Sequence, residues 1–426
     1  MDIAFPITAL LATFLGTRRS LGLGFVAMIA VGYFNGIIRA NFLGIFTTFM
    51  FDAGLLGLYL GFFLGPLGRA DGLWTGTASK FCLFLVGWPA MMSFIPINDL
   101  FVQLVALRAT VWFLPVMILA SRLTALDLAV ISRGLAILNL TALAGGIYIY
   151  QNGVESLYPV NAVTQIIYIS KDVVDHEFHR IPSTFLSSHS YGGAMLFSLP
   201  FLLERLFGVN AGKWDRLLCG LGAIAAVAGI LLCAARQPGV TLAVATIIAW
   251  VCTRFHPKFG LAAAAMILAA LAISFGDERL QRLSTLEDTE VVSRRIEGSA
   301  NESFLELIAD YPLGVGMGSS VGTSIPFFLS DRAPEQIGME NEYARILVDQ
   351  GWVGLAAWLA FLGWLLCRPP PLRLGTRWGI GVVLMYALVL TNWGTAFIGT
   401  GTLAAIPSSV LLLTQMGVLI RARGSG

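Results

Sequence analysis

Residues 340–366 read ENEYARILVDQGWVGLAAWLAFLGWLL, a run that starts with four charged side chains and continues as an almost purely apolar segment. A helix that crosses the hydrocarbon core of a membrane needs about 20 mostly apolar residues. The apolar part is long enough when its charged start lies at the membrane surface. Glu342, Arg345 and Asp349 have i,i+3 and i,i+4 spacing, so they can neutralise one another on one helix face. We therefore predict a membrane-spanning helix whose charged start either forms an internal ion pair or serves a binding site.

The composition extends this prediction to the whole chain. Of 426 residues, 57% are hydrophobic and 12% are charged, and the mean hydropathy is +0.78. Soluble domains carry about 25% charged residues, so the composition excludes that class. The apolar runs do not alternate with polar residues as barrel strands do. We predict an all-α integral membrane protein, a polytopic bundle of about 12 or 13 transmembrane helices. The expected spans are 4–16, 21–38, 42–65, 80–97, 100–120, 134–150, 188–206, 217–233, 238–253, 259–275, 343–366, 377–397 and 402–420.

The basic residues predict the orientation of the spans. If the C-terminal end with Arg421 and Arg423 is cytoplasmic, every second short loop between the spans is cytoplasmic too. Together, this end and these loops contain 16 of the 27 basic residues. This follows the positive-inside rule. Segments 151–187 and 276–340 then lie outside. The second contains 12 acidic and five basic residues, so it has a formal charge of −7 while the rest of the chain has +9.

These patterns divide the chain into five parts. Within the acidic segment, Phe304, Leu307 and Ile308 are at helical spacing before Tyr311 and Pro312, which predicts an amphipathic helix in a large extracytoplasmic loop. The parts are an N-terminal transmembrane bundle (1–150), a first outer segment (151–187), central transmembrane helices (188–275), the large extracytoplasmic loop (276–341) and C-terminal transmembrane helices (342–426).

Three stretches carry a family resemblance. The first is ADYPLGVGMGSS, followed after about twenty residues by the run that begins at Glu340. The other two are RIPSTFLSSHSYGGAMLFSLPFLLERL and LLCAARQPGVTLAVATIIAW. In order and spacing, over roughly residues 150–370, they resemble the bacterial O-antigen ligase and polysaccharide polymerase family.

The resemblance implies a GT-C type glycosyltransferase of surface polysaccharide biosynthesis. Its donor would be an oligosaccharide linked to polyprenyl (undecaprenyl) diphosphate, and its acceptor a glycan or a lipid-linked glycan. It would act without a metal ion or other cofactor on the periplasmic face of the bacterial inner membrane. We expect membrane lipids and no nucleic acid among its partners, and the sequence leaves open whether a chain-length regulator is one. The resemblance does not separate polymerase from ligase.

Several arginines could bind the leaving diphosphate. Arg236 lies in the short link CAARQPG between two spans, on the outer side, where the positive-inside rule disfavours a cation. A guanidinium matches a phosphate bidentately. Arg180, in the first outer segment, and Arg294 or Arg295, before the glycine-rich motif, are further candidates. The alternatives are contact with lipid phosphates for Arg236 and pairing with nearby acids for Arg294 and Arg295.

The acceptor side has weaker candidates. Glu340 occupies the place where the ligases usually carry a histidine, and a carboxylate there could accept the proton of the acceptor hydroxyl or orient it. The departure favours a polymerase over a ligase or removes the base role, and the alternative is a solvated acid in an acidic loop. Asn341 would bind a sugar hydroxyl or cap the following helix. His189 and Arg345 are candidate substrate-binding residues, and Gly316 could offer backbone N–H groups to an anion, although chain flexibility would also explain the glycines.

Two further patterns have simpler explanations. His176 and His179 in DHEFHR lack the spacing of a helical zinc site, so we expect no metal there. Arg108 lies inside an apolar span and must face the bundle interior, where we expect a buried pair with an acid such as Asp52, the alternative being a polar substrate path.

A transporter is the main alternative to an enzyme. A flippase for lipid-linked oligosaccharides would also have 12 to 14 spans, counted at about 20 residues each. Transporters usually show related halves with ionisable residues along a central path. Here the polar residues cluster in the two outer segments and the halves do not match, which favours a fixed active site on one side.

Overall fold

The computed structural model describes residues 2–65, 68, 76–169, 179–208, 211–253, 257, 302–320, 325–338, 341–367, 379–399 and 401–424. Regular structure in this part of the chain is helical, and an isolated bridge pairs Ser320 with Ile337. The α-helices are α1 (Ala4–Arg19), α2 (Leu21–Asn41), α3 (Ile45–Thr48), α4 (Met50–Phe63), α5 (Thr77–Met92), α6 (Leu100–Val111), α7 (Pro115–Ala120), α8 (Ala125–Asn152), α9 (Gln165–Ile169), α10 (Ser188–Phe207), α11 (Lys213–Leu232), α12 (Arg236–Cys252), α15 (Glu302–Asp310), α16 (Glu342–Leu366), α17 (Ile380–Gly394) and α18 (Ser408–Gly424). Short 3₁₀ turns are η2 (Val154–Ser156), η4 (Phe327–Arg332) and η5 (Ala396–Ile398).

Among the described helices, six segments are long and apolar enough to span a membrane. They are Leu21–Asn41, Leu100–Ala120, Ala125–Asn152, Lys213–Leu232, Glu342–Leu366 and Ile380–Ile398. Three shorter apolar helices are Met50–Phe63, Arg236–Cys252 and Ser408–Ala422. The prediction of an all-helical chain is therefore confirmed for the described residues, and six of the helices have the length and apolar composition that a membrane span needs. Every expected span except 259–275, which lies outside the described residues, contains a helix.

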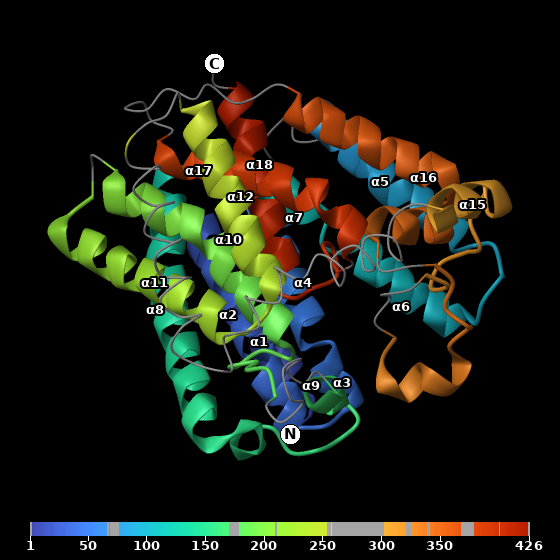
Figure 1. Ribbon diagram of the computed structural model, residues 1–426, viewed down its shortest axis with the longest axis horizontal. Helices are drawn as coiled ribbons and strands as arrows, with labels where there is room; N and C mark the ends of the chain where they lie inside the picture. Colours follow the sequence, from blue (N-terminus) through green and yellow to red (C-terminus); the bar gives the residue numbers. More distant parts are fainter. Residues whose placement is uncertain are drawn as a thin grey trace.

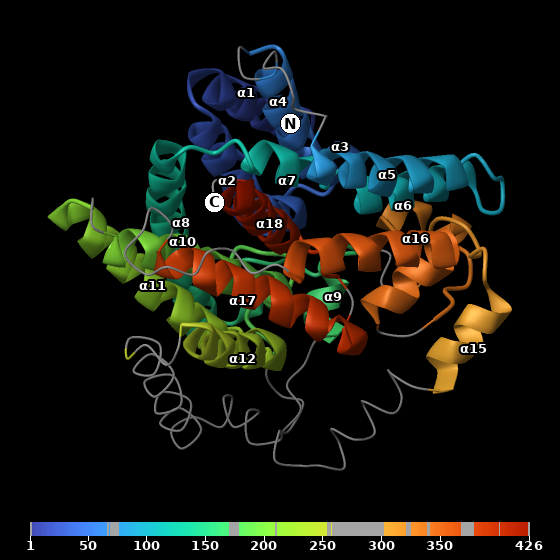
Figure 2. The same cartoon turned by 90° about the horizontal axis from the view of Figure 1, so that it is seen from above.

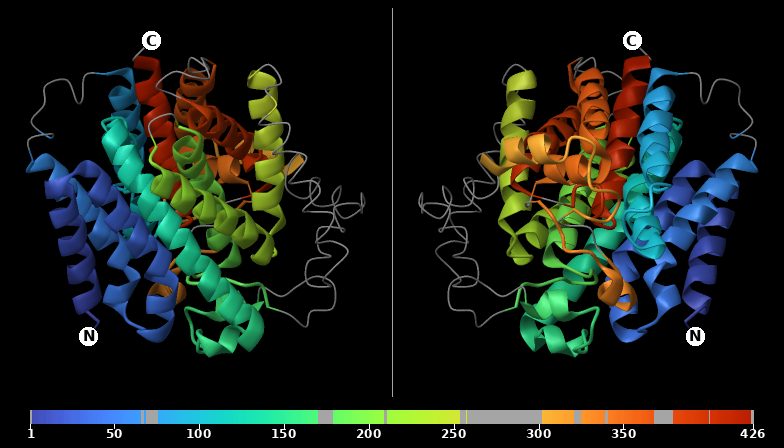
Figure 3. Two further views of the ribbon diagram at one scale, coloured as in Figure 1. Left: turned by 90° about the vertical axis from the view of Figure 1, so that its left-hand side faces the viewer. Right: turned by 90° about the vertical axis from the view of Figure 1, so that its right-hand side faces the viewer.

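The helices form a main bundle with a smaller group at its side. Figure 1 shows α5 lying along α16, and Figure 2 shows these two helices with α6 and α15 extending away from the bundle of α1, α2, α8, α10, α11, α12, α17 and α18. The N-terminus and the C-terminal end of α18 lie at opposite ends of the bundle (Figure 3).

The two ends of the bundle differ in their loops. One end, here called the long-loop end, carries the described residues of segments 153–169, 311–320, 325–338 and 395–407 without residue 400 (Figure 1). Helix ends contact two of these segments: Asn41 at the end of α2 donates to the Leu157 carbonyl at 2.9 Å, and the ring of Phe49, between α3 and α4, contacts Phe328. The opposite end is called the basic end, because there Arg133 of α8 and Arg205 of α10 both bind Asp215 of α11.

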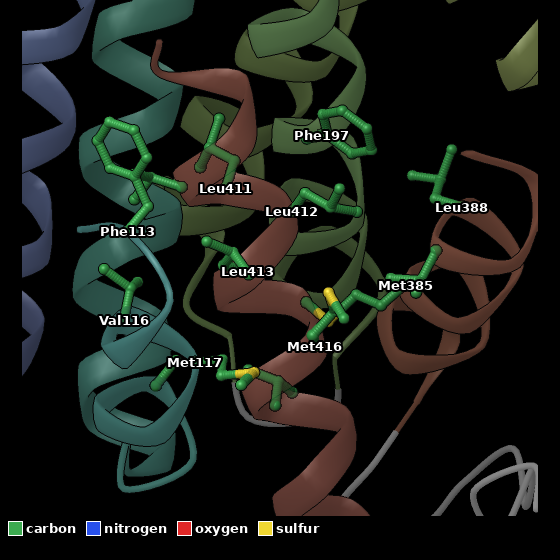
Figure 4. Packing of buried hydrophobic residues seen from close by; sticks show 14 of the residues in the cluster. Phe113, Val116, Met117, Phe197, Met385, Leu388, Leu411, Leu412, Leu413 and Met416 are labelled. Atoms are coloured by element: carbon green, nitrogen blue, oxygen red, sulfur yellow. The ribbon is translucent and has the colours of Figure 1, made fainter. Parts of the chain in front are cut away.

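Helix α18 lies at the centre of the core. Leu411, Leu412 and Leu413 are consecutive and all fully buried. Figure 4 shows why: one face of α18 meets Met117 of α7, and another approaches Phe197 of α10. A helix that is apolar all round is buried on all sides.

Helix α16 is broken at its tenth residue. Gly351 has φ 68° and ψ −177°, so α16 consists of a short first half from Glu342 to Gln350 and a longer second half. A break leaves helix carbonyls and N–H groups without their usual partners. Here Val315 N donates to the Val348 carbonyl at 2.7 Å, the Trp88 indole donates to the Gln350 carbonyl at 2.8 Å, and Trp352 N donates to the Pro312 carbonyl at 3.0 Å.

The glycine-rich motif at 312–318 fits into this break. Gly314 and Gly351 both have positive φ, which favours glycine. A Cβ on Gly314 would lie 2.7 Å from Gly351 N, and one on Gly351 would lie 2.6 Å from the Leu313 carbonyl carbon. The two backbones therefore pack directly on each other, and the two motifs of the sequence form one structural unit.

We predict that Gly351→Ala destabilises the fold by more than about 2 kcal/mol, because it adds positive-φ strain and a backbone clash. Gly363→Ala in the second half of α16 is the control, since its Cβ would meet nothing within 4 Å. That change should be neutral or stabilising by up to about 1 kcal/mol. Melting temperatures of the detergent-purified variants check this, and equal melting temperatures would contradict it.

Candidate functional site at the long-loop end

The first half of α16 carries a buried group of charges. Glu342, Arg345 and Asp349 are 0%, 3% and 1% exposed. The Arg345 guanidinium binds Glu342 Oε1, with Nε at 3.0 Å. This confirms the ion pair expected at the start of the helix. Arg345 thus lies in an internal ion pair and not on a surface that faces a ligand, so its predicted substrate contact finds no support.

Both acids of this group also hold loops in place. Glu342 Oε2 accepts a hydrogen bond from Gly401 N at 2.8 Å. Asp349 accepts from Ser320 N at 3.2 Å and from the Ser320 hydroxyl at 2.8 Å. The buried charges therefore fix loop 395–407 on one side and the glycine-rich motif on the other.

The helix starts of the C-terminal half converge around loop 395–407. Gly401 reaches the first turn of α16, and a Cβ on Gly399 would lie 3.8 Å from the Gln237 side chain in the first turn of α12. Ser408 starts α18 and donates to the Ser190 carbonyl in the first turn of α10 at 3.3 Å. Helix N-termini carry partial positive charge, so this arrangement favours negative groups.

Arg236 is the first residue of α12. The residue before the helix, Ala235, has no side chain that could cap the first N–H groups, whereas Ser187 caps α10 and Asn341 caps α16. Ala234 has a positive φ of 50°, which is uncommon for a residue other than glycine. The start of α12 thus combines an uncapped helix N-terminus with a guanidinium.

Arg180 lies near the same turn. It interacts electrostatically with the thiol of Cys233, three residues before Arg236. Gly192 of α10 packs on this turn, since a Cβ there would lie 2.7 Å from Cys233 Sγ and from Pro238. His189 is exposed one turn earlier in α10. The structure therefore brings Arg180, Arg236 and His189 into one region of the long-loop end.

The sequence analysis did not identify a set of buried polar groups at this end. Within the described chain, Ser188 Oγ, Thr391 Oγ1, Asn392 Nδ2 and Ser409 Oγ are buried with no hydrogen-bond partner. Leaving such an atom unsatisfied costs about 1–3 kcal/mol. These groups lie at the starts of α10 and α18 and the end of α17, and they suit a ligand rich in hydroxyl groups. A single serine or threonine in an apolar run does not indicate a binding site in the sequence.

Other predicted site residues have structural roles or lie elsewhere. Asn341 accepts from Tyr343 N at 2.9 Å and Ala344 N at 3.2 Å, so the helix-capping alternative is confirmed. Gly316 has φ 95° and packs against Ile97, which accounts for the glycine without an anion. Glu340, Arg294 and Arg295 lie outside the described residues.

The predicted partnership of Arg108 and Asp52 is confirmed. Arg108 Nε lies 2.5 Å from Asp52 Oδ1, and both side chains are largely buried. This pair joins α6 to the first turn of α4 at the long-loop end.

We predict that Arg345→Met destabilises the protein by about 3–5 kcal/mol, because two buried carboxylates lose their counter-charge. The double variant Glu342→Gln/Arg345→Met should lose less than the two single changes added together. Arg332→Ala is the control, since its pair with Asp99 at 3.4 Å is half exposed and should contribute below about 1 kcal/mol. Denaturant or thermal unfolding of all variants tests this, and a Met variant as stable as the control would contradict it.

Comparison with known proteins identifies no relative. No protein-family model, no curated protein and no solved structure matches the chain.

Proposed function

We propose that this chain is a membrane glycosyltransferase that polymerises or ligates polyprenyl-diphosphate-linked oligosaccharides in surface polysaccharide biosynthesis. The observation that carries the proposal is the uncapped start of α12 at Arg236, with Arg180 beside the preceding turn. Two guanidiniums at a helix N-terminus form a binding site for a diphosphate.

The finer topology belongs to the same proposal. With 12 or 13 spans in the inner membrane, counted at about 20 residues each, the long-loop end faces the periplasm and the basic end faces the cytoplasm. The placement of Arg133 and Arg205 at the end opposite to Arg236 is in keeping with this orientation.

The reaction would transfer a glycan from diphosphate to a hydroxyl. The acceptor oxygen attacks the anomeric carbon and forms the new glycosidic bond, while the bond from that carbon to the diphosphate oxygen breaks with its electron pair. Arg236 and Arg180 stabilise the negative charge that develops on the leaving diphosphate. Glu340 is our candidate to accept the proton of the acceptor.

The buried hydroxyl and amide groups give the sugar a place to bind. Ser188, Thr391, Asn392 and Ser409 can donate to or accept from sugar hydroxyls, which replaces the hydrogen bonds these buried atoms lack. Such contacts would position the glycan beside Arg236, at the convergence of the helix starts.

We expect Arg236→Ala to abolish polymer formation in cells without reducing the amount of membrane-inserted protein, because the leaving group loses its charge-assisted contacts. Arg236→Lys should retain part of the activity, since it keeps the charge but loses the bidentate fork. Arg332→Ala, which changes an exposed arginine paired with Asp99, should be tolerated. Wild-type polymer levels in well-expressed Arg236→Ala would reject the diphosphate role.

The lipid-linked glycans of a deletion strain separate the possible activities. Single repeat units that accumulate on the carrier in the outer leaflet would identify a polymerase. Full-length polymer that stays on the carrier would identify a ligase. Units stranded in the inner leaflet, with none outside, would identify a flippase and overturn the proposed enzyme.

A further inference from the structure

A second group of charges lies at the long-loop end, where α2, α4 and α6 meet. It contains the pair Arg108–Asp52 and also Arg39, in the last turn of α2. Arg39 interacts electrostatically with both Arg108 and Asp52. The proposed glycosyltransferase mechanism uses none of these three residues.

The charges in this group do not balance. Asp52 can neutralise one guanidinium, and its Oδ1 is already held by Arg108 at 2.5 Å. Asp52 is the one acid among the described residues with which Arg39 interacts electrostatically. A cation in an apolar bundle is costly unless it is paired. The group therefore has an excess of one positive charge.

Several polar atoms of the group also lack partners. Arg39 Nε is a buried donor with no acceptor in the described chain, and Asp52 Oδ2 is a buried acceptor with no donor. Asn35 lies one turn before Arg39 on the same face of α2, and its Oδ1 is likewise unsatisfied. A group that satisfies these atoms accepts a hydrogen bond from a guanidinium and also donates to one or both oxygens; a phosphate ester with a hydroxyl group has both properties.

The group is covered from the loop side. The Arg108 guanidinium lies over the Phe49 ring, 5.3 Å from its centroid, and Phe49 contacts Phe328 of η4. Aromatic rings on one side keep water from the guanidinium and strengthen its attraction for an anion. The C-terminal dipole of α2 favours Arg39 at this place too, but it offers Arg39 Nε no acceptor.

From these contacts we infer that Arg39, Asp52 and Arg108 form a binding site for a phosphate ester that carries a hydroxyl group. The phosphate oxygens accept from the guanidinium of Arg39, whose fork matches them bidentately. The hydroxyl donates to Asp52 Oδ2 or Asn35 Oδ1. A phosphatidylglycerol headgroup and a soluble glycerol phosphate share this chemistry.

The test uses the full chain with Arg236→Ala as background, so that the proposed diphosphate site does not contribute to binding. The melting temperature is measured against glycerol 3-phosphate at constant ionic strength, with chloride as the reference anion. A ligand that binds only the native state raises the melting temperature in a saturable way. We expect the melting temperature to rise to a plateau with glycerol 3-phosphate in the background variant and in Arg236→Ala/Arg332→Gln. Addition of Arg39→Gln should weaken the apparent affinity at least about tenfold, and Arg39→Lys less than that.

A second arm identifies the source of the phosphate. Each variant is reconstituted in nanodiscs of phosphatidylcholine with phosphatidylglycerol, and retained lipids are detected by native mass spectrometry. Retention of phosphatidylglycerol that Arg39→Gln abolishes identifies a lipid headgroup. Binding of glycerol phosphate without a retained lipid identifies a soluble ligand, and either outcome supports the site.

Two outcomes would overturn the inference. One is an Arg39→Gln variant that binds glycerol phosphate and retains lipid as its parent does. The other is the absence of both binding and retention in the parent. A purely structural Arg39 would lower the melting temperature equally with and without the ligand. An anion site instead predicts that, without a ligand, Arg39→Gln melts no lower than its parent, because an unpaired buried charge is removed. The polymer assay of Arg236→Ala tests the proposed function, and the binding assays of the Arg39 variants test the phosphate site. The two proposals can therefore fail independently.

Discussion

A buried arginine cannot remain without counter-charges, and Arg345 imposes this constraint on the C-terminal half of the fold. Its guanidinium lies against Glu342, and Glu342 and Asp349 each hold a loop by hydrogen bonds to backbone N–H groups. The same three charges thus fix the start of α16, loop 395–407 and the glycine-rich motif. Once these are fixed, the starts of α10, α12 and α18 have a common neighbour.

The break at Gly351 separates a charged first half of α16 from an apolar second half. The first half of α16 is short and enclosed by other chain segments, so its charges find partners. The second half continues as an apolar helix against α5. A continuous helix would have no exposed carbonyls for Val315 N and the Trp88 indole to bind. The break therefore joins the glycine-rich motif to the helix that follows it in sequence.

Much of this fold was predictable from two features of the sequence. These are the lengths of the apolar runs and the few charges that lie within them, which need partners. The helical runs, the ion pair at the start of α16 and the pairing of Arg108 with Asp52 all follow from the cost of polar groups in apolar surroundings. The break was not predicted, since the hydrophobic run continues through Gly351 and one glycine has many possible reasons. For Arg345 the sequence left an ion pair and a ligand contact open, because spacing does not show which side of a helix is enclosed; the structure shows the ion pair. The buried hydroxyl and amide groups near loop 395–407 can be recognised only when the packing of α10, α17 and α18 is known.

The arginines at the two ends of the bundle differ in their acidic partners and in their exposure to solvent. This difference affects where a phosphate would bind. At the basic end, Arg133 and Arg205 share Asp215, and the amides of Gly379 and Gly381 donate to Glu204. Acids there have partners, and Arg133 is about half exposed, so water can solvate its remaining charge. At the long-loop end, the carboxylate of Asp52 binds Arg108, and Arg39 interacts electrostatically with both without an ion pair of its own in the described chain, while Arg236 stands at a helix start that already favours anions. Positive charge that solvent cannot screen attracts an anion more strongly than the same charge in water. Arg39 is such a charge, since its Nε has no acceptor among the described residues. At Arg236 the favourable field for an anion comes from the helix start itself.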